Sequence, residues 1–240
     1  MLKTLAELGF IAISIDGRYH GERQTGTGAT RYVAAMLQTY RTGQGRPFLY
    51  DTVWNLMRLV DYLETRPDVD AKRIGMTGFS KGGMETYLTA AVDPRIAVAV
   101  PMIGVQSFGW ALENEMWMSR VGTFQAAVDQ AAKEAGVGRV DAAFIRTFYD
   151  RVVPGIYGQF DGPAMVPLIA PRPLLVINGD SDARTPLPGL MECIRPTEQA
   201  YKRTKAGDKF KLYLQKDTGH TVNPEALQVA VNWFVEWLKP

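Results

Sequence analysis

The sequence predicts an α/β protein with a mostly parallel sheet flanked by helices. Short apolar runs that end at turn residues alternate with longer stretches in which apolar residues recur at helical spacing, and this alternation is typical of strand–helix–strand units. Five runs have the composition and length of strands. They are "FIAISID" (10–16), "RIGMTG" (73–78), "IAVAVPMIG" (96–104), "PLLVING" (173–179) and "KFKLYLQ" (209–215).

Helices are predicted between and around these runs. The opening "MLKTLAELG" has the pattern of a short amphipathic helix, and "DTVWNLMRLVDYLETRP" (51–67) places its apolar residues in one stripe behind Asp51 as N-cap. The last helix begins near Asn223, which can cap, and Pro224, which suits the first helical position. Residues 105–170 contain aromatic-rich helical pieces without a clear strand. We therefore expect a single domain over 1–240, with 105–170 as a helical insertion that forms a partial cap.

Composition limits the function classes. The chain has 240 residues, of which 46% are hydrophobic, so it can bury a substantial core. Its 27 basic and 25 acidic residues are spread without a block of one sign. Such a block would be expected in a protein that binds nucleic acid or an anionic membrane, so we expect neither as a partner. A small-molecule or polymer-end substrate is expected instead.

The opening segment and the single cysteine set two further limits. Glu7 and Gly9 interrupt the apolar residues near the start, so this segment is predicted to be neither a signal peptide nor a transmembrane span. If Met1 is the native start, we expect a cytoplasmic protein. Cys193 is the only cysteine, which excludes an intrachain disulfide, and it is predicted to be a small buried hydrophobe. The sequence leaves open whether the chain forms a homo-oligomer.

The stretch "RIGMTGFSKGGMETYLTAAVD" (73–93) contains the pattern G-x-S-x-G at Gly78, Ser80 and Gly82. It directly follows a predicted strand and precedes a helical pattern, which is the context of a nucleophilic serine on a sharp strand-to-helix turn. Side chains at Gly78 and Gly82 are expected to collide with neighbouring elements. The backbone N–H of Lys81, at the start of the helix, is expected to donate a hydrogen bond to an oxyanion. The alternative is a loop serine without chemistry.

A nucleophilic serine needs a base, and the chain has only two histidines. His220 lies after the last predicted strand, whereas His20 follows the first. On an elbow of this type the triad order is serine, acid, histidine, which favours His220 as the base and a structural or pocket-lining role for His20. The acid should follow the run 173–179, where Asp180 and Asp182 both qualify; an aspartate after glycine is also a common turn residue.

These motifs, in this order, resemble the α/β-hydrolase superfamily, and more narrowly its dienelactone hydrolase and acetyl xylan esterase-like branch, with prolyl oligopeptidase-type domains close by. The resemblance covers nearly the whole chain. It rests on "DGRYHGER" (16–23), "GFSKGG" (78–83), "IAPRPLLVINGDSDARTP" (169–186) and "TGH" (218–220). In that branch the acid lies in G-x-x-D-x-x-x-P, which Gly179, Asp182 and Pro186 satisfy. The resemblance therefore implies a catalytic triad of Ser80, Asp182 and His220.

The resemblance implies hydrolysis of a carboxylic ester, such as a short acyl or acetyl ester, through an acyl-enzyme on Ser80, without a metal or cofactor. Dienelactone hydrolases generally carry a cysteine nucleophile, so the serine here favours an ordinary ester. We expect Trp110, Trp117 and Phe124 to line the substrate pocket, although aromatic residues at helical spacing more often pack in a core. Two alternatives are a prolyl oligopeptidase-type serine peptidase and a non-catalytic or incomplete hydrolase fragment.

The family resemblance also implies a short N-terminus. The run 10–16 would be the fourth of eight strands, and the strand that normally lies between it and the run 73–78 has no counterpart before residue 10. The loop after that strand supplies the second oxyanion N–H in the family. We therefore expect the run 10–16 to pair with the run 73–78, or an outside strand to fill the slot. We also expect weak activity unless this donor is replaced.

Overall fold

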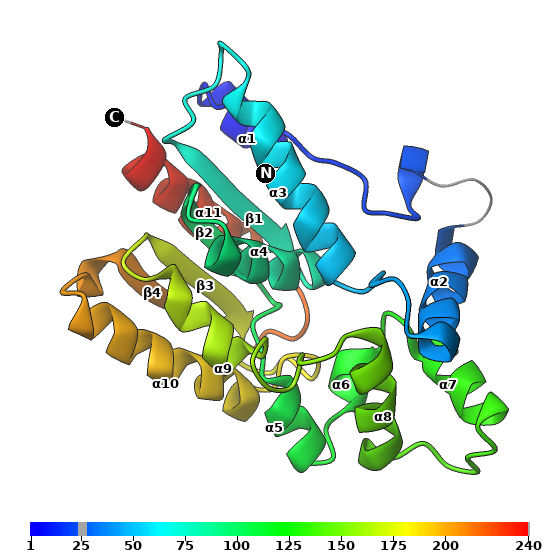
Figure 1. The fold of residues 1–240 in the computed structure, drawn as a ribbon. Coiled ribbons are helices and arrows are strands. Elements are labelled where there is room, and N and C mark those ends of the chain that lie inside the picture. Colours follow the sequence, from blue (N-terminus) through cyan, green and yellow to red (C-terminus); the bar gives the residue numbers. More distant parts are fainter. Residues whose placement is uncertain (24–27, 240) are drawn as a thin grey trace. The chain divides into compact units, whose positions relative to one another are not determined.

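The fold was analysed in a computed structural model that describes residues 1–23 and 28–239 (Figure 1). Four strands form one parallel sheet, in which neighbours in space are also neighbours in sequence. In sheet order they are β1 (Ile74–Phe79), β2 (Ile96–Met102), β3 (Leu174–Gly179) and β4 (Phe210–Gln215). Parallel strands require crossover connections, which explains the alternation of strands and helices along the sequence.

Helices make up most of the remaining described chain. The α-helices are α1 (Leu2–Glu7), α2 (Gly28–Thr42), α3 (Tyr50–Glu64), α4 (Lys81–Val92), α5 (Phe108–Glu113), α6 (Met118–Val121), α7 (Gln125–Glu134), α8 (Ala142–Val152), α9 (Gly162–Met165), α10 (Leu187–Arg203) and α11 (Pro224–Leu238). Three 3-10 turns are η1 (Gly21–Arg23), η2 (Val166–Ile169) and η3 (Gly207–Lys209).

The sequence located the four strands and the main helix boundaries within a few residues. The Asn223 side chain accepts a hydrogen bond from the Ala226 N–H and so caps α11, as predicted. The predicted N-cap of α3 is wrong. That helix already begins at Tyr50, and the Asp51 carboxylate accepts a hydrogen bond from the Arg18 guanidinium instead.

The predicted strand at 10–16 is also wrong, because this segment has no strand assignment and does not pair with β1. Its apolar side chains alternate as in a strand. Phe10 and Ala12 pack partly against the core, whereas Ile11, Ile13 and Ile15 are exposed. A strand also needs a neighbour for its backbone hydrogen bonds, and the pattern of side chains cannot supply one. Within the described residues, the sheet ends at β1.

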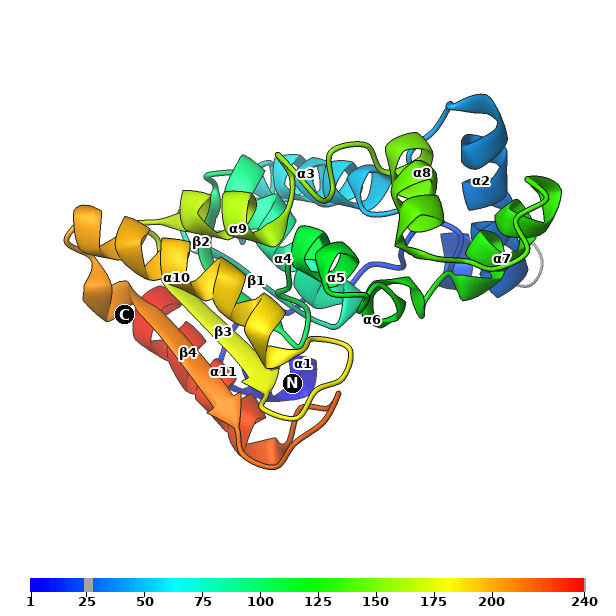
Figure 2. The ribbon, with the colours of Figure 1, turned by 90° about the horizontal axis from the view of Figure 1, so that it is seen from below.

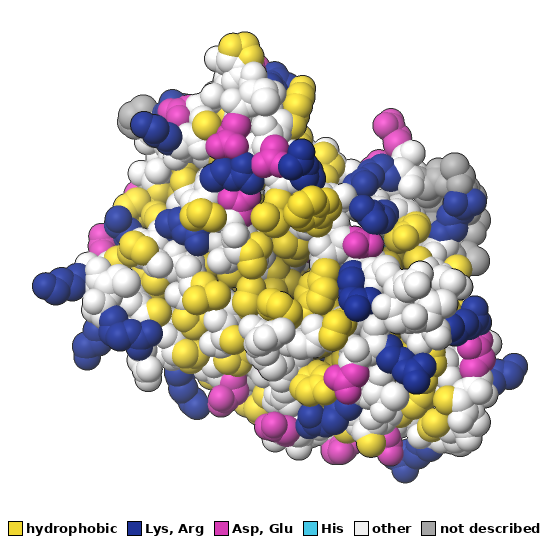
Figure 3. Space-filling model, viewed as in Figure 1, with side chains coloured by type: hydrophobic (Ala, Val, Ile, Leu, Met, Phe, Trp, Pro, Cys, Tyr) yellow, Lys and Arg dark blue, Asp and Glu magenta, His cyan; other side chains and the backbone are white. Residues whose placement is uncertain are grey.

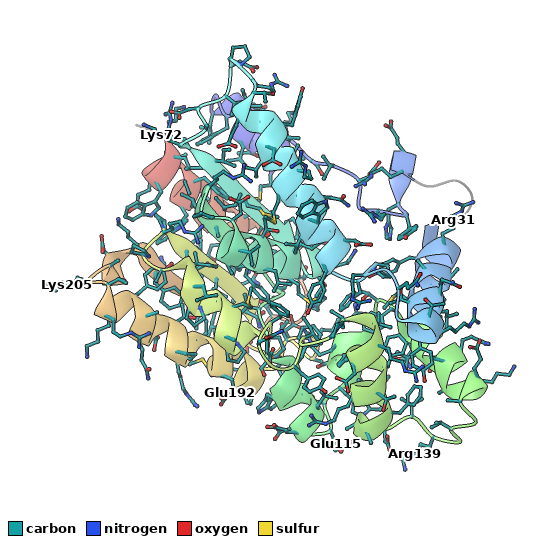
Figure 4. The ribbon with its side chains drawn as sticks, in the orientation of Figure 1. Arg31, Lys72, Glu115, Arg139, Glu192 and Lys205 are labelled. Atoms are coloured by element: carbon teal, nitrogen blue, oxygen red, sulfur yellow. The ribbon has the colours of Figure 1, made fainter. Side chains whose placement is uncertain are left out.

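The core lies on both faces of the sheet. Helices α1 and α11 cover one face, where Phe234 of α11 belongs to the same buried cluster as Val98, Val100 and Ile177 of the strands. Helices α4 and α10 lie on the other face (Figure 2). Strand β3 is buried along its whole length, as expected for a parallel strand covered on both sides. On α10, Cys193 is buried as predicted, whereas Glu192 next to it points away from the sheet (Figure 4).

The described chain divides into two compact units. The first contains 1–14, 56–107 and 162–240, and thus the whole sheet. The second contains 15–55 and 108–161, which are joined by contacts of α2 with α7 and α8. The predicted insertion (105–170) supplies only part of the second unit. The sequence did not group 15–55 with it, and the expectation of a single domain with a partial cap stays a prediction.

The surface bears charges of both signs. On the face drawn in Figure 3, lysine and arginine side chains are interspersed with aspartate and glutamate. Among the described helices, none has both the length and the apolar character that a membrane crossing requires.

The contact between α4 and β2 leads to a first prediction. A Cβ on Gly83 would lie 2.5 Å from the Met102 carbonyl oxygen, so this helix can approach the strand only with glycine at position 83. We expect Gly83→Ala to lower the free energy of unfolding by about 1 to 3 kcal/mol. Gly82→Ala, one residue away, is the matched control, because a Cβ there meets nothing within 4 Å. Urea unfolding of both variants tests this; equal stability would contradict it.

Candidate active site

Ser80 lies on the sharp turn between β1 and α4. Its backbone has φ 52° and ψ −111°, a conformation that non-glycine residues rarely adopt. Two hydrogen bonds hold it. The Ser80 N–H donates to the Met102 carbonyl at the end of β2 (2.9 Å), and the Ser80 carbonyl accepts from the Met84 N–H in α4 (3.0 Å). The backbone at Ser80 is thus fixed from both flanking elements.

Close backbone contacts explain the glycines around Ser80, with one correction. A Cβ on Gly78 would lie 2.5 Å from the backbone of Gly82, as expected. Gly82 itself was expected to collide with neighbours, but a Cβ there would meet open space. The reason is that Gly82 is the partner approached by Gly78. A Cβ on Gly104, which follows β2, would overlap the Ser80 carbonyl oxygen and lie 2.8 Å from the Met84 nitrogen.

The structure brings Ser80, His220 and Asp182 together in one hydrogen-bonded chain. His220 Nε2 lies 2.8 Å from Ser80 Oγ, and His220 Nδ1 lies 2.8 Å from Asp182 Oδ2. Ser80 follows β1, Asp182 follows β3 and His220 follows β4. The carboxyl ends of these strands lie at the same edge of the parallel sheet. An ionised carboxylate only accepts hydrogen bonds, so Nδ1 carries the ring hydrogen and Nε2 is the acceptor for the serine hydroxyl.

The Asp182 carboxylate is buried and held by several donors. The N–H groups of Arg184 (2.8 Å) and Thr185 (3.2 Å) donate to Oδ1, and the Thr185 hydroxyl donates to Oδ2 (2.5 Å). Burial alone would raise the pKa of Asp182, but the hydrogen bonds from His220, Thr185 and Arg184 outweigh it and lower this pKa below its ordinary value. Asp182 therefore stays ionised at neutral pH.

The Thr185 hydroxyl lies between two acceptors. Besides Asp182 Oδ2, it lies 2.8 Å from Asn178 Oδ1, and the Asn178 amide nitrogen donates to the carbonyls of Gly179 and Thr185. These two carbonyls fix the orientation of the amide. Because a hydroxyl has one hydrogen, Thr185 donates to one acceptor at a time, and the charged carboxylate binds it more strongly than the amide oxygen.

The other acid candidate, Asp180, does not contact the histidine ring. Its carboxylate accepts hydrogen bonds from the N–H groups of Asp217 and Thr218 and from the Ser181 hydroxyl. These bonds lower the pKa of Asp180, and the bond from the Ser181 hydroxyl contributes most, followed by the bond from the Asp217 N–H. The structure thus places Asp182, and not Asp180, at the imidazole.

The remaining predicted residues are placed as follows. Lys81 is the first residue of α4, and its ammonium forms an ion pair with Glu85 (3.3 Å). His20 belongs to the second unit, and its Nδ1 lies 2.9 Å from the Arg18 carbonyl oxygen. No group of three or more His, Cys, Asp or Glu side chains suited to a metal occurs within 1–23 and 28–239.

The three expected pocket residues all lie in the second unit. Phe124 is buried there, with its ring stacked on Phe148 and tilted against Phe48, which is the core packing that was the alternative. Trp110 and Trp117 are half-buried. A substrate-binding role for the three stays a prediction.

Several residues that shape the site were missed in the sequence. Thr185 holds the Asp182 carboxylate, Asn178 bonds Thr185, and Gly104 allows the close approach to Ser80. Thr185 precedes Pro186 within the G-x-x-D-x-x-x-P pattern, which is the only signal that could have suggested it.

A family model described as "Glucuronyl esterase, fungi" matches residues 21–205, more than half of the chain. The chain belongs to this family. It is also 28% identical over 222 residues to the 4-O-methyl-glucuronoyl methylesterase of Hypocrea jecorina (strain QM6a), with 85% of this chain and 46% of that protein covered. The present chain, as a member of the glucuronyl esterase family, thus spans about half the length of the Hypocrea jecorina protein.

Two further similarities concern the whole chain. YtaP of Bacillus subtilis (strain 168) is 26% identical over 234 residues, which cover 98% of this chain and 67% of YtaP. The crystal structure of TT1662 from Thermus thermophilus superposes with a TM-score of 0.61 at 19% identity and covers 100% of this chain and 82% of TT1662. The fold is that of the α/β-hydrolases, as the sequence resemblance implied.

The surroundings of Asp182 lead to the second prediction. Thr185→Val removes a donor from a buried carboxylate, so the pKa of Asp182 should rise and the free energy of unfolding at pH 7 should fall by about 1 to 3 kcal/mol. A lowered carboxyl pKa stabilises the fold above about pH 4, and this contribution is lost as the pH falls through the folded-state pKa.

The difference between Thr185→Val and the wild type should therefore be larger at pH 7 than at pH 2.5. Urea unfolding at both pH values measures it. Thr185→Ser keeps the hydroxyl and serves as the control. An equal loss of stability at the two pH values would show that the hydroxyl does not act through the charge of Asp182.

Proposed function

We propose that this chain is a serine hydrolase that cleaves a carboxylic ester. The observation that carries the proposal is the chain of hydrogen bonds from Ser80 Oγ through the His220 ring to the Asp182 carboxylate, with 2.8 Å at both steps. Membership of the glucuronyl esterase family supports the same reaction class. The proposal assigns the roles of nucleophile, base and acid to these three residues.

The proposed reaction is a two-step acyl transfer. His220 Nε2 takes the hydroxyl proton as Ser80 Oγ attacks the ester carbonyl, and a tetrahedral oxyanion forms. The Lys81 N–H, at the positive end of the α4 dipole, is the proposed donor to this oxyanion. The C–O bond to the alcohol then breaks, and the alcohol leaves with the proton from His220. A water molecule repeats the sequence on the acyl-enzyme and releases the acid and Ser80.

The strained backbone of Ser80 has a direct use in this reaction. Because the conformation is fixed by Met102 and Met84, the hydroxyl does not need to be oriented at the moment of attack. Asp182 contributes through charge, since an ionised partner at Nδ1 stabilises the imidazolium that forms when His220 accepts the proton.

For the substrate class we propose an ester of a uronic acid, with the sugar carboxylate as the acyl part. This proposal rests on the matching family model and on the name of the methylesterase from Hypocrea jecorina. A methyl glucuronate ester is therefore the first substrate to try.

The third prediction tests the triad. We expect Ser80→Ala and His220→Ala each to lower ester hydrolysis by about 10⁴- to 10⁶-fold, because triad members act as a unit. His20→Ala should keep most of the activity. Hydrolysis of a chromogenic ester and labelling by a fluorophosphonate both report on Ser80. If His20→Ala were as inactive as His220→Ala while still folded, the base would be wrongly assigned.

The fourth prediction tests the substrate class. The wild type should hydrolyse methyl glucuronate with a higher kcat/KM than p-nitrophenyl acetate, and should leave Xaa-Pro peptides intact. Ser80→Ala is the control for background hydrolysis. A preference for p-nitrophenyl acetate would support the esterase activity but contradict the uronic acid ester as its substrate class. Cleavage of Xaa-Pro peptides would indicate a peptidase.

A further inference from the structure

The loop that carries His220 is held by two side chains that do not touch the ring. We call residues 216–222, between β4 and α11, the histidine loop. Fixing the backbone of each residue in one conformation costs about 1 to 2 kcal/mol of entropy. Without contacts that offset this cost, the loop would adopt many conformations and would not hold the imidazole in one position. The contacts that fix the histidine loop therefore bear on how often Ser80 and His220 meet.

Asp180 holds the first part of the histidine loop. Its Oδ2 accepts from the Asp217 N–H (3.1 Å) and its Oδ1 from the Thr218 N–H (3.2 Å). The Ser181 hydroxyl also donates to Oδ1 (2.9 Å), so both oxygens act as acceptors. Asp217 has a positive φ of 50°, which is unfavourable for a non-glycine residue without such support.

Gln215 holds the second part of the histidine loop. Its side chain is buried, its amide nitrogen donates to the Thr221 carbonyl (2.9 Å), and its amide oxygen accepts from the Asn223 N–H (2.8 Å). The amide thus satisfies one backbone group on each side of Val222, next to the start of α11. His220 lies between the segment held by Asp180 and the segment held by Gln215.

Asp180 and Gln215 lie next to each other at the end of the sheet. Gly179 of β3 pairs with Gln215 of β4, and the Asp180 N–H donates to the Gln215 carbonyl (3.1 Å). A Cβ on Gly179 would overlap the Thr218 carbonyl oxygen, so the loop packs directly on the backbone at the end of β3. The strand that leads to Asp182 thus also supports the loop that carries His220.

We propose that Asp180 and Gln215 are positioning residues, which fix the histidine loop so that His220 faces Ser80 and Asp182 together. This inference rests on the proposed function, since it assigns a role within the same triad. Neither side chain exchanges a proton with the substrate. Their effect is on the fraction of molecules in which the hydrogen-bonded triad is assembled, so it should appear in kcat more than in KM.

Asparagine cannot replace Asp180 in this role. The carboxylate presents two acceptors to two backbone N–H groups, whereas an asparagine amide presents one acceptor and one donor. In Asp180→Asn one backbone N–H would face an NH₂ group, and that end of the loop would be released. The change is isosteric and lies at the surface end of the sheet, so the variant is expected to fold.

The fifth prediction compares Asp180→Asn with Asp182→Asn and with a matched control. Asp208→Asn removes the same charge on η3, which precedes β4 and lies at the other end of that strand from the histidine loop. We expect Asp180→Asn to lower kcat on the order of 10-fold with KM little changed, and Asp182→Asn about 10⁴-fold. Asp208→Asn should match the wild type. Gln215→Met, which keeps the volume of the side chain, should also lower kcat.

Two further measurements separate positioning from stability. Hydrogen exchange of a peptide covering 216–223 should be faster in Asp180→Asn than in the wild type. In a His220→Ala background, Asp180→Asn should still speed this exchange, because its contacts are to the backbone of the histidine loop and not to the ring. Unchanged exchange in either background, or an unchanged kcat, would overturn the proposal. Failure of the wild type to hydrolyse any ester would instead contradict the proposed function. The exchange measurement would still show whether Asp180 restrains the histidine loop.

Discussion

The contact between the Ser80 turn and the end of β2 is the constraint on which the site depends. Ser80 keeps its positive φ because its N–H is bonded to Met102 and its carbonyl to Met84, and because no side chain at Gly104 separates these backbones. A positive φ costs a non-glycine residue free energy that other contacts must offset. Here the offset comes from backbone groups of two packed elements, so the hydroxyl is oriented by the fold of the first unit and not by a flexible loop.

The order of the strands explains how distant residues meet. Because β1 to β4 are parallel, their carboxyl ends lie along one edge of the sheet, and each of the loops after β1, β3 and β4 delivers one of Ser80, Asp182 and His220. Asp182 and His220 follow directly paired strands, which lets residues just after β3 bond the histidine loop. Ser80 follows β1, which β2 and β3 separate from β4, so the His220 ring spans the distance between the loop after β4 and the Ser80 turn.

The sequence predicted those parts of the structure that follow from local pattern and chain order. The four strands and the α11 cap at Asn223 depend on residues close to each motif, and the choice of His220 over His20 as the serine's neighbour depends on chain order. The strand at 10–16 failed because alternating side chains do not create a hydrogen-bonding neighbour. Gly104 could not be found, since it acts on the backbone of Ser80 and Met84, which are distant in the sequence. Asn178 and Gln215 could not be found either, since their bonds depend on the conformation of the loops after β3 and β4, which local pattern does not specify. The grouping of 15–55 with 108–161 is likewise a matter of packing between distant segments.

The two aspartates after β3 show why residue type alone does not define a role. Both have lowered pKa values and both lie within hydrogen-bonding distance of the segment that carries His220, yet they bind different groups. Asp180 accepts hydrogen bonds from the Ser181 hydroxyl and from two backbone N–H groups of the histidine loop, so its charge stabilises the conformation of that loop. Asp182 is buried, and one of its oxygens accepts from the imidazole while the other accepts from backbone N–H groups. A buried carboxylate interacts more strongly with a developing positive charge than an exposed one, because water screens it less. Burial and the bond to the ring thus suit Asp182 to stabilise an imidazolium, whereas Asp180, which is half-buried, holds the chain through its bonds to backbone N–H groups.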